Sequence, residues 1–322
     1  MALHRPSGRN ALGFAFASTT MLLWGVLPLA LRRALRDVEP VTLTGFRFAV
    51  SALALGALLA ARGRLPALTD LSRSGRVLLA VATLGLAANY IAFVLGLDHT
   101  SPANAQVLIQ LGPLLLALGG LVVFGERFTA LQWSGFALLV LGLGTFFEGQ
   151  LVALGRELDR YLTGVAWIAF AAATWAVYGL AQKQLLLALP SQGLMLCIYV
   201  GCALCFAPGF DAGALRGLSA GTWGVLAFCA ANTVVAYGAF AAALEHWEAS
   251  RVSAVLALTP LATLGFSVLA TAVAPGEIAT ERLPLTSWLG ALAVVAGSLL
   301  TALGRSRARP VQEAPAAVLE PK

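Results

Sequence analysis

Long uninterrupted runs of apolar residues dominate the chain, and short polar segments separate them. Each run has about 20 residues, the length that an α-helix needs to cross roughly 30 Å of hydrocarbon. No segment between runs exceeds about 20 residues, so the chain has no room for a separate soluble domain. The pattern predicts an all-α integral membrane protein with ten transmembrane helices, at residues 11–31, 41–60, 77–97, 104–124, 130–147, 164–185, 191–209, 222–244, 252–274 and 286–304.

The second half of the chain repeats the first. Residues 90–99 (Tyr-Ile-Ala-Phe-Val-Leu-Gly-Leu-Asp-His) recur at 237–246 as Tyr-Gly-Ala-Phe-Ala-Ala-Ala-Leu-Glu-His, and Pro113 falls on Pro260 at the same offset. A match of this length indicates a supersecondary unit copied once. Because five spans per copy is an odd number, the second copy must cross the membrane in the opposite orientation. The sequence therefore predicts two inverted five-helix repeats.

The repeat and the charges divide the chain into five predicted parts. With both termini in the cytoplasm, most Lys and Arg residues lie on the inner side, as the positive-inside rule requires. The C-terminal part is too polar and proline-rich to pack, so we expect it to be disordered. The parts are a cytoplasmic N-terminus (1–10), a first repeat (11–147), a connecting loop (148–163), a second repeat (164–304) and a cytoplasmic tail (305–322).

Composition agrees with a membrane protein and disfavours other classes. Hydrophobic residues make up 59% and charged residues 11% of the chain, whereas about a quarter of a soluble protein is charged. The net charge of +6 is scattered through the connecting segments without an aromatic-interleaved basic face, so we expect no nucleic-acid partner. The four cysteines lie in apolar spans and the three histidines are dispersed. We expect no metal, no cofactor and no enzymatic activity.

Short motifs add a family resemblance to this pattern. Trp24 and Trp175 lie in the first helix of each repeat, Pro113 and Pro260 lie in the fourth, and Gly-Glu-Arg-Phe-Thr (residues 125–129) precedes the fifth helix. In order and doubled spacing the chain resembles the EamA family of the drug/metabolite transporter superfamily, over about residues 11–304. The resemblance implies a secondary transporter, because members export amino acids and other small metabolites or exchange nucleotide sugars and organic phosphates.

The connection between the ninth and tenth spans departs from the family pattern. Residues 273–281 (Val-Ala-Pro-Gly-Glu-Ile-Ala-Thr-Glu) replace a tight Gly-Glu turn. Either Glu277 or Glu281 is then the counterpart of Glu126, and the following Arg282 and Trp288 favour Glu281.

An inverted duplication is itself typical of carriers, because tilting one half against the other exposes a central site to each side in turn. We expect an exporter of small polar metabolites, such as amino acids, in the bacterial inner membrane. Ten spans suffice to enclose a pathway, so a monomer surrounded by lipid and carrying a small-molecule substrate is the default. No carboxylate lies mid-span, which fits facilitated diffusion or exchange.

Two other interpretations stay open. Multidrug efflux is disfavoured, because the first span lacks the acidic residue that small cation exporters of the superfamily carry. A non-transporting membrane scaffold or lipid-binding protein would not require polar residues to recur in both halves.

Polar side chains within the spans are candidate substrate contacts, because they need partners away from lipid. Gln106 and Gln110 share a face of the fourth helix and lead to Pro113, which bends a helix and frees a backbone carbonyl. Two amides and a free carbonyl suit a zwitterion or a sugar. The alternative is hydrogen bonding across a helix interface.

Amides and phenols lie at similar depth in both halves. Asn89 and Tyr90 are in the third span, and Asn232 and Tyr237 are in the eighth. We predict that they line a cavity, with interhelical hydrogen bonding again the alternative.

Two tryptophans lie near mid-membrane and not at the interface, where Trp usually anchors a helix. The depth of Trp24 and Trp175 therefore favours a cavity. Tyr178 shares the face of Trp175, and the pair could form an aromatic wall for a planar or cationic substrate or simply pack in the core.

Arg47 lies about 9 Å into the second span, at 1.5 Å per residue. We expect its side chain to snorkel outward or to pack against a helix, because an arginine at the membrane centre costs about 2.5–3.5 kcal/mol on insertion scales. If it faces a cavity, it offers a fixed positive charge to a carboxylate or phosphate.

Charged pairs near the span ends suggest gates. We hypothesise that ion pairs latch each mouth and break alternately, with His99 and His246 titrating as a switch; helix capping at the interface is the alternative. The pairs are Asp98-His99 with Glu281-Arg282 at the outer face, and Glu245-His246 with Glu126-Arg127 at the inner face.

Overall fold

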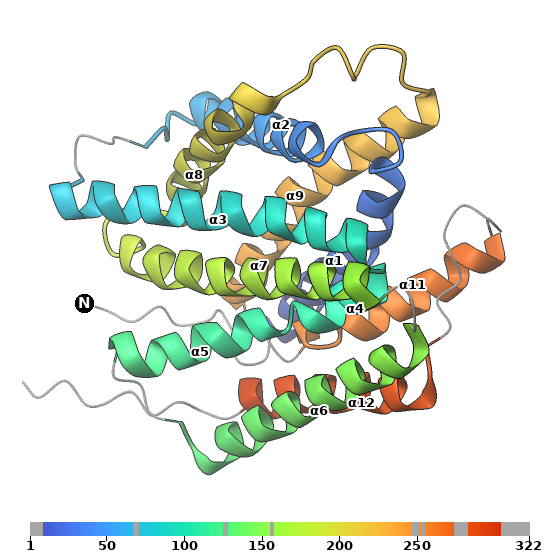
Figure 1. The fold of residues 1–322 in the computed structure, drawn as a ribbon. Helices are drawn as coiled ribbons and strands as arrows, with labels where there is room; N and C mark the ends of the chain where they lie inside the picture. Colours follow the sequence, from blue (N-terminus) through green and yellow to red (C-terminus); the bar gives the residue numbers. More distant parts are fainter. Residues whose placement is uncertain are drawn as a thin grey trace, which may run out of the picture.

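A computed structural model describes residues 9–66, 71–124, 128–154, 158–246, 252, 255–273 and 283–303 (Figure 1). Every regular element within these residues is a helix. Eight of the described helical segments are long and apolar enough to cross a membrane, and two shorter apolar helices cover Thr259–Val273 and Leu285–Thr301. The chain is therefore an all-α integral membrane protein.

The described helices follow the predicted apolar runs closely. They are α1 (Asn10–Ala34), α2 (Pro40–Ala61), α3 (Arg73–His99), α4 (Pro102–Leu108), α5 (Leu111–Phe124), α6 (Ala130–Leu154), α7 (Leu158–Leu185), α8 (Ser191–Phe206), α9 (Ala220–His246), α11 (Thr259–Val273) and α12 (Leu285–Leu303). A single 3₁₀ turn, Ala207–Gly209, extends α8.

Capping residues fix where several helices begin. The Ser72 hydroxyl accepts a hydrogen bond from the Gly75 N–H at 3.1 Å and so caps α3. The Ser101 hydroxyl does the same for α4, accepting from the Asn104 N–H at 3.2 Å. Both contacts satisfy an N–H of the first turn that has no partner within the helix.

The fourth predicted span is interrupted where Pro113 predicts a bend. Helix α4 ends at Leu108 and α5 begins at Leu111. Pro113 has no N–H to offer the carbonyl of Ile109, but that carbonyl accepts the Gly112 N–H at 2.8 Å. The predicted bend is confirmed, whereas the predicted free carbonyl is wrong, because a tight turn supplies a replacement donor.

Pro260 repeats this arrangement in the second half. Helix α11 begins at Thr259, directly before the proline. The carbonyl of Leu256, four residues before Pro260, accepts the Thr259 hydroxyl at 2.5 Å. Both breaks therefore keep their backbone groups satisfied, which the membrane requires of any interrupted helix.

Some predicted parts look different or lie outside the described residues. Helix α6 continues to Leu154 and α7 begins at Leu158, so helices extend into the segment predicted as a connecting loop. Residues 1–8 and 304–322, which hold most of the predicted N-terminal segment and the predicted tail, lie outside the described residues.

Helices that are distant in sequence pack in pairs (Figure 1). Helix α3 lies along α7, α1 along α9, α2 against α8, and α6 against α12. The short helix α4 contacts α1, α7 and α11, and all of its residues are buried. These pairings surround the part of the molecule where the buried polar side chains meet.

Glycines bring α6 and α12 into backbone contact. A Cβ placed on Gly142 would lie 2.6 Å from the backbone nitrogen of Val294, and one on Gly297 would lie 2.4 Å from that of Leu139. No side chain fits at such distances. Close helix packing through small residues is a main source of helix association in membranes.

Candidate functional site

Four tyrosines from four helices gather around α2: Tyr90 of α3, Tyr178 of α7, Tyr199 of α8 and Tyr237 of α9. We call these four residues the tyrosine cluster. Phe48 of α2 packs its ring on Tyr90, with 4.6 Å between the ring centroids, and on Tyr199, with 6.0 Å. Tyr90 and Tyr237 lie within interaction range of each other. These two tyrosines occupy matching positions of the repeated ten-residue segment.

The two predicted tryptophans lie beside the tyrosine cluster. The ring of Trp24 meets Tyr237 edge-on at 5.4 Å between centroids and lies 6.0 Å from Phe240. Trp175 packs, partly buried, against the same hydrophobic core as the cluster. Its ring also lies beside the helix break, because a Cβ on Gly112 would be 3.2 Å from Trp175 Cε3. Trp24 thus lies beside the tyrosine cluster, and Trp175 lies beside both the cluster and the helix break.

The hydroxyl of Tyr178 is bound to another core residue. The hydroxyl donates to the Met195 sulfur at 3.4 Å, and the residue is 3% exposed. Among the described residues, no ring contact joins Trp175 to Tyr178. Tyr178 is therefore packed in the core, and an aromatic wall formed by Trp175 and Tyr178 stays a prediction.

The two predicted asparagines tie helices together. Asn89 Nδ2 donates to the carbonyl of Ala171 at 2.8 Å, which joins α3 to α7. Asn232 Nδ2 donates to the carbonyl of Leu23 at 2.7 Å, which joins α9 to α1. The alternative of interhelical hydrogen bonding therefore describes both amides, although Asn232 Oδ1 has no partner among the described residues.

The two predicted glutamines lie at the interrupted helix. Gln106 is in α4, Gln110 is in the turn before α5, and both are buried. Gln110 Nε2 has no hydrogen-bond partner among the described residues. A donor is thus left available at the junction of α1, α7 and α11, where α4 packs.

Arg47 points inward. The residue is 2% exposed, its Nη2 donates to the Thr233 hydroxyl at 3.2 Å, and its guanidinium carbon lies 4.9 Å from the centroid of the Tyr90 ring. Of the two expected placements, the structure shows packing against neighbouring helices and not outward snorkelling, because α2 turns this residue toward α3 and α9. Within the described part of the chain no carboxylate pairs with it, and Nε has no partner.

An unpaired arginine in this place needs an explanation. Insertion scales give about 2.5–3.5 kcal/mol for an arginine at the centre of a span, and ionisable residues inside membranes are usually functional. The cation–π contact with Tyr90 offsets part of that cost, by about 0.5–2 kcal/mol. The guanidinium therefore belongs to the candidate site together with the tyrosine cluster.

The two histidines contact their surroundings differently. The Nδ1 of His99 lies 2.8 Å from the carbonyl of Leu95, one turn earlier in α3. The ring of His246 stacks on Phe16 of α1, with 6.0 Å between centroids. Capping of the helix end describes His99, and the titrating switch stays a prediction.

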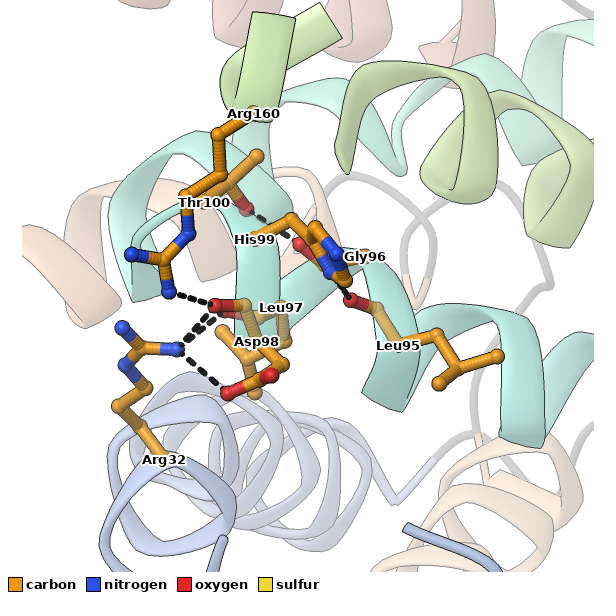
Figure 2. A network of polar contacts seen from close by, with 8 residues as sticks. All are labelled: Arg32, Leu95, Gly96, Leu97, Asp98, His99, Thr100 and Arg160. Carbon is orange, nitrogen blue, oxygen red and sulfur yellow. Dashed lines mark hydrogen bonds and ion pairs between the residues drawn. The ribbon is translucent and has the colours of Figure 1, made fainter. Parts of the chain in front are cut away.

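Asp98, predicted to belong to an outer latch, is bound by two arginines that the sequence analysis did not place there (Figure 2). Arg32 at the end of α1 donates to the carboxylate of Asp98 at 3.1 Å and to its carbonyl at 2.6 Å. Arg160 at the start of α7 donates to the same carbonyl at 2.9 Å. We call these three residues the α1–α3–α7 junction. Glu126 and Glu281, the acidic partners predicted for the two mouths, lie outside the described residues.

Several residues of the site were missed in the sequence. Tyr199 carries the same signal as Tyr90 and Tyr237, a phenol in mid-span, and could have been found. Thr233 and Ser51 could not, because hydroxyls are common in membrane helices and usually bond to their own backbone. Arg32 gave a weaker signal, a cation that can meet the carbonyls at the end of a neighbouring helix.

The helices bury polar and aromatic side chains between them, and helices are interrupted at matching places in the two halves. These features are typical of membrane transporters. The profile of the EamA-like transporter family matches residues 11–147 and 162–303. The chain belongs to this family, which is part of the drug/metabolite transporter superfamily and is a family of transporters, not enzymes.

Relatives of the chain agree with this membership. The "Uncharacterized inner membrane transporter YhbE" of Escherichia coli K12 is 39% identical over 295 residues, covering 91% of this chain and 92% of the relative. A "Probable amino-acid metabolite efflux pump" of the same organism is 23% identical, covering 89% and 94%. A solved crystal structure shares the fold with a TM-score of 0.60 and 19% identity, covering 92% of this chain and 96% of that one.

Proposed function

We propose that the protein is an inner-membrane secondary transporter that exports small polar metabolites, such as amino acids, by alternating access. The observation that carries the proposal is the tyrosine cluster, in which the matching and partly buried Tyr90 and Tyr237 meet beside Trp24 and Arg47. The names of the two relatives point the same way, to an inner-membrane transporter and to amino-acid metabolite efflux.

The helix pairing supports an arrangement of two inverted repeats. If α1, α2, α3 and α6 correspond to α7, α8, α9 and α12, the pairing of α3 with α7 has its counterpart in α9 with α1. Likewise, α5 packs on α7 as α11 packs on α1. The pairs α2–α8 and α6–α12 each join a helix to its own counterpart in the other half. This is the pattern expected for two halves related by a two-fold axis in the membrane plane.

Polar contacts recur at matching positions too. Asn89 Nδ2 donates to the carbonyl of Ala171, and the Thr20 hydroxyl donates to the carbonyl of Ala236 at 3.3 Å. In the sequence alignment of the halves Thr20 is the counterpart of Ala171, and Ala236 is the counterpart of Asn89. Equivalent helix crossings in the two halves are therefore both joined by a side-chain hydrogen bond. In one crossing the donor lies on α3, and in the other it lies on α1, the counterpart of α7.

The charges suggest how the protein is oriented in the membrane and that its outer side is closed. With both termini in the cytoplasm, the α1–α3–α7 junction lies on the outer side. Its hydrogen bonds join the outer ends of three helices. We propose that this junction is the outer latch and that it breaks when the carrier opens outward.

Two alternatives make different predictions. Multidrug efflux by cation antiport needs an acidic residue in the pathway, and α1 contains no Asp or Glu. A non-transporting scaffold predicts that cells expressing the protein export nothing new.

Profiling extracellular metabolites in cells that express the protein tests the proposal. We expect wild-type cells to accumulate one class of small polar metabolite outside, and the double variant Trp24→Ala/Trp175→Ala to lose this export. The matched control is Trp133→Ala/Trp167→Ala, which removes two tryptophans that are 49% and 36% exposed on outer helix faces.

The outcomes separate the interpretations. Loss of export in the first double variant and its retention in the control would support a carrier with its site between the halves. Equal profiles for wild type, both variants and empty vector, with all proteins inserted, would contradict export and favour a scaffold. Export of organic cations alone would favour multidrug efflux.

A further inference from the structure

Arg47 has unused hydrogen-bonding capacity in a buried place. Of the guanidinium nitrogens, Nη2 meets the Thr233 hydroxyl and Nε has no partner among the described residues. The face of the guanidinium rests on the Tyr90 ring. Contacts of this kind hold the group in position, but they supply no negative charge to balance it.

A second unsatisfied polar atom lies one helical turn away. The Oγ of Ser51 is fully buried and has no hydrogen-bond partner within the described part of the chain. Residues four apart share a face of an α-helix, so Arg47 and Ser51 present their free polar atoms from the same side of α2. Two such atoms, independent of each other, point to a ligand that can accept hydrogen bonds from both.

We propose that Arg47 and Ser51 bind the carboxylate group of the transported substrate, with Thr233 and Tyr90 holding the guanidinium in place. This inference rests on the proposed function and narrows it, because it makes a carboxylate the feature that all substrates share. A guanidinium presents its N–H donors in the fixed geometry that a carboxylate matches. The hydroxyl of Ser51 supplies a further donor.

The charge of the site favours a carboxylate over a phosphate. Arg47 is the cation that rests on Tyr90, and among the described residues no carboxylate forms an ion pair with it. One positive charge neutralises a carboxylate, whereas a phosphate dianion would leave an uncompensated negative charge in a buried place. Phosphate esters are therefore expected to bind weakly.

The phenols and indoles around the site suit the remainder of such a substrate. Trp24 and Tyr237 pack together next to the tyrosine cluster. Aromatic faces attract an ammonium group without requiring a carboxylate partner. An amino acid could thus bind by its carboxylate at Arg47 and by its ammonium group against these rings.

The test compares acids with their neutral amides on the purified full chain in lipid nanodiscs. Thermal unfolding is measured with increasing L-alanine, L-alaninamide, propionate, propionamide and inorganic phosphate. We expect both carboxylates to raise the unfolding temperature of the wild type at concentrations at least about tenfold lower than their amides or phosphate, since hydrogen bonds to charged groups contribute this much.

Three variants sharpen the comparison. Arg47→Gln should lose the preference for acids over amides, while Arg47→Lys should keep it at about tenfold weaker affinity, because a lysine holds the charge but not the fork of donors. The control Arg62→Gln removes an exposed cation just after the same helix and should behave as the wild type. If Arg47→Gln does not fold, Arg47→Lys alone still tests the geometry.

Two results would overturn the inference. One is that acids and amides stabilise the wild type equally, or not at all. The other is that Arg47→Gln, properly folded, keeps the preference of the wild type.

Export measurements on the same variants separate this inference from the proposed function. Carboxylate binding without any export would contradict transport and leave the site intact. Export of compounds that lack a carboxylate, or unchanged export by Arg47→Gln, would contradict the role of Arg47 and leave transport intact.

Discussion

Two helix contacts in this protein are built in opposite ways. Helices α6 and α12 meet backbone to backbone through Gly142 and Gly297, where no side chain fits. The contact between the ends of α1 and α3 is instead made of hydrogen bonds from Arg32, and the side chains of Arg32 and Asp98 are 32% and 47% exposed. An exposed ion pair contributes only about 0.2–1 kcal/mol. The first contact therefore suits a permanent frame and the second a latch that opens and closes.

The largest effect is expected from a side chain placed in the frame. Gly142→Leu puts four carbons where even a Cβ would lie 2.6 Å from the backbone of Val294. The helices must separate, so we expect the yield of folded protein in the membrane to fall severely, because overpacking of this kind typically costs about 1–3 kcal/mol or more. The measurement is size-exclusion chromatography of detergent-extracted protein, with a fluorescent fusion as reporter.

The same helix offers a matched control. Gly144 lies two residues further on, and a Cβ there meets no atom within 4 Å. Gly144→Leu should give nearly the wild-type yield. Equal losses for the two variants would show that α6 responds to added volume in general, and would remove the distinction between frame and latch.

An intermediate effect is expected at the latch. Arg32→Ala removes its bonds to Asp98 and to the carbonyl of Leu97, so the outer ends of α1 and α3 should separate more readily. We expect a cysteine at Ser51, in a background without the native cysteines, to react with a water-soluble thiol reagent added from outside up to about fivefold faster, as the loss of an exposed pair allows.

Arg33→Ala provides the comparison for this measurement. Arg33 pairs with Asp37 in the i, i+4 relation beside the same helix end. Its loss should leave the labelling rate close to that of the wild type. A rate unchanged by Arg32→Ala, or raised equally by both variants, would contradict a latch at Asp98.

Much of the fold could be predicted from the sequence, because a helix that crosses the membrane must be apolar and about 20 residues long. Apolar runs gave the spans, and Pro113 gave the break between α4 and α5. The donor that satisfies the carbonyl of Ile109 could not be predicted, since it depends on how the turn at Gly112 closes.

The sequence predicted which residues belong to the candidate site better than it predicted how they contact one another. Tyr90 and Tyr237 stand out as phenols in mid-span, and the structure brings them together. The direction of Arg47 depends on which face of α2 packs against α9, which no local pattern reports. For the same reason the sequence pointed to Glu281-Arg282, which lies outside the described residues, as the partner of Asp98-His99. It missed Arg32, whose contact with Asp98 exists only in three dimensions.

The smallest effect concerns the connection between α1 and α2, next to the latch. Asp37 accepts hydrogen bonds from the Thr222 hydroxyl at 2.5 Å and from Arg33 at 2.8 Å, and these contacts lower the pKa of its carboxyl group, Thr222 most strongly. Since the folded-state pKa lies below that of the unfolded chain, the stabilisation is present above about pH 4 and is lost as the pH falls through the lowered pKa. Asp37→Asn should therefore unfold at a slightly lower temperature than the wild type at pH 7, and the difference should shrink as the pH falls below about 4. Thermal unfolding in nanodiscs over this pH range measures it, and a difference that stays constant with pH would show that the ionised carboxylate plays no part in holding α1 to α9.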